Sequence, residues 1–174
     1  IGVEIPLDAA QSSTVNGATG GTVTLRVTGC VNEQPGGKKP PVTTTVTNES
    51  RKNDDCKKTV IGDLSFKFEP NSFELKGQPY AGVATVEGFQ FDLTRPNPIP
   101  GDQSATYQGK SVRLETFGAF HVQPRDAVGN LLQMTAGKSA GVSMPIHPLA
   151  LATAPATIPF FRYEEATGLW VEHG

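Results

Sequence analysis

Three histidines, His121, His147 and His173, are the side chains of this chain best suited to act as a base near neutral pH. Some β-sandwich modules cleave themselves where a histidine stands shortly before a serine or threonine and activates its hydroxyl. No hydroxyl or thiol occupies that position after His121 or His147. We therefore interpret His121 as a strand residue with a half-buried ring. A processing (autoproteolytic) domain, whose cleavage would pair this chain with a segment after Gly174, is kept as an alternative.

Other catalytic patterns are weak in this sequence. No P-loop occurs, and no local motif indicates a Ser/His/Asp or Cys/His arrangement. The adjacent carboxylates of Glu164 and Glu165 fall at an expected turn, where solvation explains them. We therefore expect no enzyme activity.

Calcium binding would require several oxygen ligands that converge on one point. The candidate ligands, which lie at expected strand ends or in loops, are Asp92, Asp102, Asp126 and Asn130. Their spacing does not follow an EF-hand series, and residues 126–130 are typical of a hairpin turn. We expect no cofactor, with a calcium site as the alternative.

The two cysteines, Cys30 and Cys56, stand 26 positions apart and flank a long polar loop at residues 31–55. The loop has few apolar residues that could anchor it otherwise, so we predict a disulfide between Cys30 and Cys56. A disulfide implies an oxidising compartment, hence an extracellular or cell-surface location. Two free thiols are the alternative, whereas two cysteines without nearby histidines are too few for zinc.

Composition narrows the class of protein further. The net charge of −2 and the absence of a basic patch argue against nucleic-acid binding. No apolar run reaches the roughly 18 residues of a membrane-spanning helix, so we expect no membrane insertion. We expect one domain over residues 1–174, excised from a longer protein, with the loop at residues 31–55 inserted in it.

Short strand-like segments separated by glycine and proline recur along the chain, which has 19 glycines and 14 prolines. This pattern is typical of an all-β fold, and we predict an antiparallel β-sandwich with long loops. The expected strands are residues 22–28, 42–47, 64–68, 83–93, 111–114, 119–122, 140–146 and 158–163. The residues expected to form most of one core are Phe66, Phe68, Val86, Phe89, Phe91, Phe117 and Phe120.

The last fifteen residues predict a terminal hairpin. We expect Gly168 at a positive φ in its turn, and Trp170 packed beside Phe160 or Phe161. Tyr80, Tyr107 and Trp170 are the candidates for an aromatic platform that binds a ligand.

Three segments within residues 60–174 resemble a known family. They are residues 66–83, which include Phe66-Lys67-Phe68-Glu69-Pro70, residues 114–132, and residues 158–171, which include Thr167-Gly168-Leu169-Trp170. Their order resembles the β-rich ectodomain segment of cartilage intermediate layer protein, which also occurs in large bacterial surface proteins. The resemblance implies an extracellular β-sandwich-like region with a non-enzymatic role, and no catalytic residues carry over.

We therefore expect a non-catalytic structural or adhesive module of a secreted or cell-surface protein, whose partners are other domains of the same parent protein. A glycan- or protein-binding domain is the first alternative, and the processing domain is the second.

Overall fold

The chain folds almost entirely into β-strands. The computed structural model describes residues 10–30, 58–91, 93 and 99–173. Its elements in chain order are β1 (Gln11–Asn16), β2 (Gly21–Cys30), β3 (Lys58–Phe68), β4 (Phe73–Leu75), β5 (Gln78–Pro79), β6 (Val83–Gln90), β7 (Ser104–Tyr107), β8 (Lys110–Arg113), β9 (Phe120–Arg125), β10 (Gln133–Met134), β11 (Ala140–Ser143), α1 (Pro148–Leu151), β12 (Phe161–Glu164) and β13 (Leu169–Glu172). The all-β class predicted from the sequence is confirmed. The strand expected at residues 42–47 and the loop at residues 31–55 lie outside the described residues.

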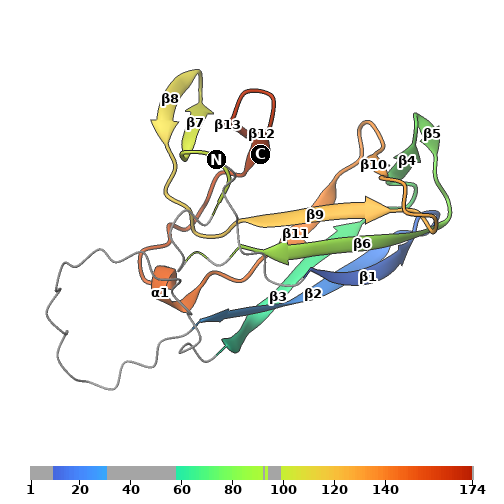
Figure 1. Cartoon of the computed structure of the whole chain (residues 1–174), viewed down its shortest axis with the longest axis horizontal. Coiled ribbons are helices and arrows are strands. Elements are labelled where there is room, and N and C mark those ends of the chain that lie inside the picture. The colour runs from blue at the N-terminus through green and yellow to red at the C-terminus, as the bar shows by residue number, and fades with distance from the viewer. Residues whose placement is uncertain (1–9, 31–57, 92, 94–98, 174) are drawn as a thin grey trace, which may run out of the picture.

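Two antiparallel sheets enclose the main hydrophobic core in a sandwich-like arrangement. Their strand orders are β1-β6-β9 and β11-β3-β2. In Figure 1, β6 and β9 lie above β2 and β3. Every second side chain is buried over residues 23–27 of β2 and residues 64–68 of β3, because alternate side chains of a strand point to opposite faces of its sheet. The core is lined mainly by Val23, Leu25, Leu64, Phe66, Phe68, Phe73, Ala84 and Val86.

The predicted core is confirmed in part. Phe66, Phe68 and Val86 are buried, with exposed fractions of 1%, 6% and 0%. Phe120 is half-buried but packs against this core, whereas the prediction was wrong for Phe89, Phe91 and Phe117, which are half-buried and not part of it. Phe89 points away from the core because it lies between the inward-facing residues of β6, and Phe91 and Phe117 lie outside the strands. Phe73, which is 1% exposed, was missed.

The first two strands join the two sheets. β1 pairs with β6, whereas β2 pairs with β3. The side-chain amide of Gln11 in β1 binds the backbone of Arg26 in β2, because its Oε1 accepts the Arg26 N–H at 2.7 Å and its Nε2 donates to the Arg26 carbonyl. One glutamine side chain therefore takes the place of a backbone partner along this edge of β2.

A small sheet of order β10-β4-β5 caps one end of the sandwich, at the right of Figure 1. Together with the turns at residues 16–20, 69–72, 80–82 and 126–138 we call it the tip. The N–H of Gly17 donates to the Gly82 carbonyl at 2.8 Å, and the N–H of Asn71 donates to the Gly17 carbonyl at 2.9 Å. A Cβ on Gly17 would lie 2.5 Å from the Tyr80 carbonyl oxygen, so this close approach requires glycine.

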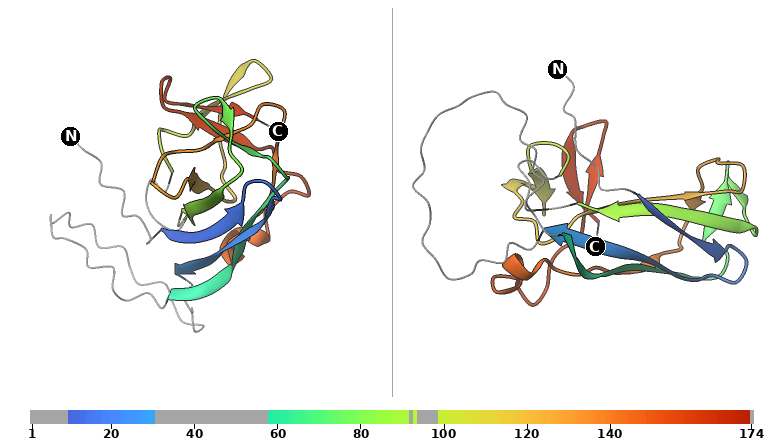
Figure 2. Two further views of the ribbon diagram at one scale, coloured as in Figure 1. Left: turned by 90° about the vertical axis from the view of Figure 1, so that its right-hand side faces the viewer. Right: turned by 60° about the horizontal axis from the view of Figure 1, so that its bottom comes forward.

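A four-stranded sheet of order β12-β13-β7-β8 stands beside the sandwich, at the end opposite the tip (Figure 2). Its pairs are antiparallel except β13 with β7, which is parallel. The ring of Phe160, just before β12, stacks on that of Phe120 in β9 with centroids 5.8 Å apart. This stack is a direct contact between the four-stranded sheet and the sandwich.

Candidate functional site

Four aromatic side chains share one face of the four-stranded sheet. Trp170 lies opposite Tyr163 on one side and Ala105 on the other, so the three point to the same face. Phe161 and Tyr107 stand two positions from Tyr163 and Ala105, and alternation brings them to that face as well. We call Tyr107, Phe161, Tyr163 and Trp170 the aromatic face. All four rings are half-buried.

The rings are held in place by one another and by the chain that precedes β7. Tyr163 and Trp170 have centroids 5.4 Å apart, and Tyr107 and Phe161 have centroids 6.1 Å apart. The indole Nε1 of Trp170 donates to the Pro100 carbonyl at 3.1 Å. A Cβ on Gly101 would lie 3.1 Å from the Tyr163 ring, so the backbone crosses closely over this part of the face.

Charged side chains border the other part of the aromatic face. Lys110 lies opposite Tyr107 across β7 and β8, and Glu172 lies opposite Phe161 across β12 and β13. Both charged residues are exposed. The face therefore offers half-exposed rings with a cation and an anion beside them, which suits contact with a partner rather than proton transfer.

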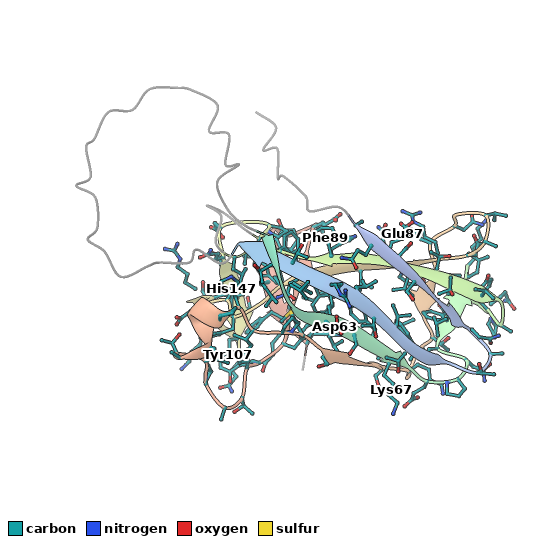
Figure 3. All side chains as sticks on the ribbon, turned by 90° about the horizontal axis from the view of Figure 1, so that it is seen from below. Asp63, Lys67, Glu87, Phe89, Tyr107 and His147 are labelled. Carbon is teal, nitrogen blue, oxygen red and sulfur yellow. The ribbon has the colours of Figure 1, made fainter. Side chains whose placement is uncertain are left out.

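The structure brings together two of the three predicted platform residues. Tyr107 and Trp170 lie on the same face, but Tyr80 belongs to the tip, where its hydroxyl donates to the Val83 carbonyl at 3.0 Å. Figure 3 shows Tyr107 at the end of the molecule that also holds His147, away from Lys67. Sequence analysis missed Tyr163 as part of the site, although its alternation with Phe161 was the available signal.

The terminal hairpin forms as predicted, with one correction. Gly168 has a φ of 70° in the turn, and its N–H donates to the Glu164 carbonyl at 2.8 Å. The expected packing of Trp170 beside Phe160 or Phe161 was wrong, because the residue opposite Trp170 is Tyr163. Glu165 is exposed in the turn as expected, whereas Glu164 is the half-buried last residue of β12.

The histidines lie on three separate elements. His121 is a strand residue as predicted, but it is exposed rather than half-buried, because it faces outward from β9 and stacks on Phe89 at 5.5 Å. His147 is buried just before α1, with an exposed fraction of 6%. The N–H of His173 donates to the Phe160 carbonyl at 2.8 Å.

One motif was not included in the interpretation of the sequence. Residues 137–141, Gly-Lys-Ser-Ala-Gly, match the Gly-Xaa-Ser-Xaa-Gly spacing of a nucleophile elbow. That elbow requires a sharp turn from a strand into a helix, whereas Ser139 is an exposed residue between a turn and β11. The motif therefore lacks the structural context that would activate its serine.

The carboxylate of Asp126 accepts hydrogen bonds from residues of its own turn. Its Oδ1 accepts the N–H groups of Val128 at 3.0 Å and Asn130 at 2.8 Å, and its Oδ2 accepts from the Asn130 amide at 2.8 Å. The hydrogen bond from the Asn130 side chain is the main reason that the pKa of Asp126 is lowered. This confirms the hairpin turn predicted at residues 126–130.

Asp102, another candidate calcium ligand, belongs to a different turn. Asp102 accepts the N–H of Ser104 at 2.9 Å at the start of β7. Hydrogen bonding by Ser104 is the main reason that the pKa of Asp102 is lowered. Asp92 lies outside the described residues. Within the described part of the chain, no three His, Cys, Asp or Glu side chains gather in a way that could hold a metal ion.

Cys30 is the last residue of β2, and Cys56 lies outside the described residues. The predicted disulfide is therefore still a prediction. The register places Lys58, two positions after Cys56, directly opposite Cys30.

Comparisons with protein-family models, with curated proteins and with solved structures find no match to this chain. The resemblance to the cartilage intermediate layer protein segment therefore stays an expectation. In the described ranges, no helix has the length and apolar character needed to cross a membrane.

Proposed function

We propose that this chain is a non-catalytic structural or adhesive module of a secreted or cell-surface protein. The observation that carries the proposal is the aromatic face. Large apolar patches on a protein surface commonly mark contact sites, and aromatic side chains contribute much area at a small entropic cost. The sandwich would serve as the scaffold, and the face would contact another domain of the parent protein or a separate ligand.

The register of β2 and β3 supports an oxidised, extracellular form. Lys58 pairs with Cys30, and Cys56 stands only two positions before Lys58 in the sequence. This short separation in sequence from the partner of Cys30 supports a disulfide between the two cysteines. A disulfide there would close the loop of residues 31–55.

A glycan ligand is the second candidate for the aromatic face. It is favoured by the exposed Lys110 and Glu172 beside Tyr107 and Phe161. Ring faces can cover the apolar face of a sugar while charged side chains bind its hydroxyl groups.

The test uses two variants of the aromatic face, Tyr107→Ser and Phe161→Ser. The labelled protein is applied to a glycan array and to a panel of immobilised extracellular-matrix proteins. We expect binding by the wild-type protein and its loss in both variants, since the rings supply the contact area. A signal on the glycan array supports a sugar ligand, and a signal on matrix proteins alone supports a protein ligand.

Val83→Ser is the matched control, because Val83 is 52% exposed on the sandwich. All variants should keep the cooperative thermal unfolding of the wild-type protein. Equal binding by the control and the two aromatic variants would contradict a role for the aromatic face.

A further inference from the structure

The free edge of β11 lacks the protection that edge strands usually have. Exposed edges invite pairing with other chains, and proteins commonly protect them with charged residues, proline or short strands. Such devices occur in the edge strands of the other large sheets, as Pro124 in β9, Lys110 and Arg113 in β8, and Arg162 and Glu164 in β12. β1 also has no charged residue or proline, but its Gln11 side chain binds the backbone of Arg26 at the edge of β2.

β11 has the sequence Ala-Gly-Val-Ser and carries neither a charge nor a proline. Short length alone does not set β11 apart, because β8 and β12 are also four residues long and nevertheless carry charged residues. β11 pairs with β3 on one side, and none of the described residues forms a backbone hydrogen bond with its other side.

Beside this edge, the side chain of Val142 faces the core but is not fully covered by the described residues. It lies opposite Phe66 in the register of β11 and β3, so its side chain points to the core face of the sheet. Phe66 is 1% exposed, but Val142 is 44% exposed. Another strand beside β11 would cover Val142 and satisfy the free backbone groups together.

We propose that β11 pairs edge to edge with β11 of a second copy of this chain. An antiparallel pair related by a two-fold axis at Val142 places the two Val142 side chains next to each other on the core face. It sets Gly141 opposite Ser143 of the second copy. The two sheets of order β11-β3-β2 then form one continuous sheet across the dimer.

The charges near β11 favour a second copy as the occupant. Lys138 is the only charged residue in the segment 138–146, and the two-fold axis places the two Lys138 side chains at opposite ends of the paired strands. The net charge of each chain is only −2, so the repulsion between the copies is small. Within β11 itself, uncharged residues thus face uncharged residues of the second copy.

Sedimentation equilibrium of the full chain tests the proposal. We expect the wild-type protein to form dimers as its concentration rises, and Val142→Lys to weaken association about tenfold or more, because it places a charge at the edge. Val83→Lys is the matched control, since Val83 is 52% exposed on β6, which has paired strands on both sides. The control should associate like the wild-type protein.

Hydrogen exchange identifies the edge itself. The amides of residues 140–143 should exchange more slowly as dimers form. If Val142→Lys does not fold, Ser143→Lys replaces it, because Ser143 is exposed and points away from the core. A wild-type protein that is monomeric up to about 1 mM overturns the proposal. So does a dimer without slower exchange at β11, or equal weakening by the control.

Discussion

The sandwich and the four-stranded sheet use similar alternating sequences to different ends. In the sandwich, Leu64, Phe66 and Val86 are at most 1% exposed, because a second sheet lies over the first. In the four-stranded sheet, the equivalent inward alternation produces only half-buried rings, and Ala105 is its one strand residue that is fully buried, at 2%. An alternating strand makes a core only where another layer covers it.

The two regions should therefore differ in how much they contribute to folding stability and to partner binding. The sandwich has an interior of its own and should carry most of the free energy of unfolding. The four-stranded sheet depends on separate contacts, such as the Phe160–Phe120 stack and the Trp170–Pro100 hydrogen bond. Its rings are thus left available for a partner.

Phe66→Ala should have the largest effect and tests the comparison directly. Phe66 is 1% exposed, and its ring lies 5.2 Å from that of Phe120. Its truncation leaves a cavity and should lower the free energy of unfolding by about 3–5 kcal/mol in urea denaturation. Tyr107→Ala should cost about 1 kcal/mol or less. Equal losses would mean that the two regions share one core.

Reduction of the predicted Cys30–Cys56 disulfide should have the next largest effect, and it acts on the sandwich alone. A loop closed over 26 positions should contribute roughly 3–4 kcal/mol in the chain-entropy model. Intact mass should fall by two hydrogens relative to the reduced protein, and reductant should lower the urea midpoint. Two thiols that react with alkylating agents in the native protein would disprove the bond.

Trp170→Phe should have a smaller effect, confined to the four-stranded sheet. It keeps an aromatic ring but removes the N–H that donates to the Pro100 carbonyl. We expect a loss of about 1 kcal/mol and faster hydrogen exchange in β7 and β13, with no change in β3. Faster exchange in β3 to the same extent would show that the two regions open together.

Lowering the pH should have the smallest effect on stability, and this effect should arise at Asp126 in the tip. The pKa of Asp126 is lowered below its ordinary 3.8, so the charged form stabilises the folded state above that pH. This contribution should be lost as the pH falls through the lowered pKa. Asp126→Asn should reduce the acid dependence of the urea midpoint below pH 4, and Asp63→Asn is an exposed control. Identical pH profiles for all three proteins would contradict this.

Local patterns in the sequence predicted many of the strands and turns, but they missed β1 and β7 and did not specify the sheets. Alternation indicated β2, β3 and β6, and the turn residues Asp126 and Gly168 were recognised correctly. The parallel pairing of β13 with β7 joins residues about sixty positions apart, and no local pattern specifies it. The packing of Trp170 on Tyr163 rather than on Phe161 reflects a two-residue difference in hairpin register, which keeps the same face of the sheet and which alternation therefore does not determine.

The core was predicted too broadly for a related reason. Aromatic residues were assigned to it by type, but whether Phe89 is buried depends on which face of β6 meets the second sheet. Ala84, Val86 and Gly88 occupy that face, so Phe89 must face outward.

The Gln11 amide also has a consequence for the ageing of the protein. Its nitrogen donates to the Arg26 carbonyl, and its oxygen accepts the Arg26 N–H. Hydrolysis of that amide to a carboxylate would remove the donor and set a negative charge against a carbonyl oxygen. A change of one mass unit would then open the edge of β2, while every backbone bond of the sheet stayed intact.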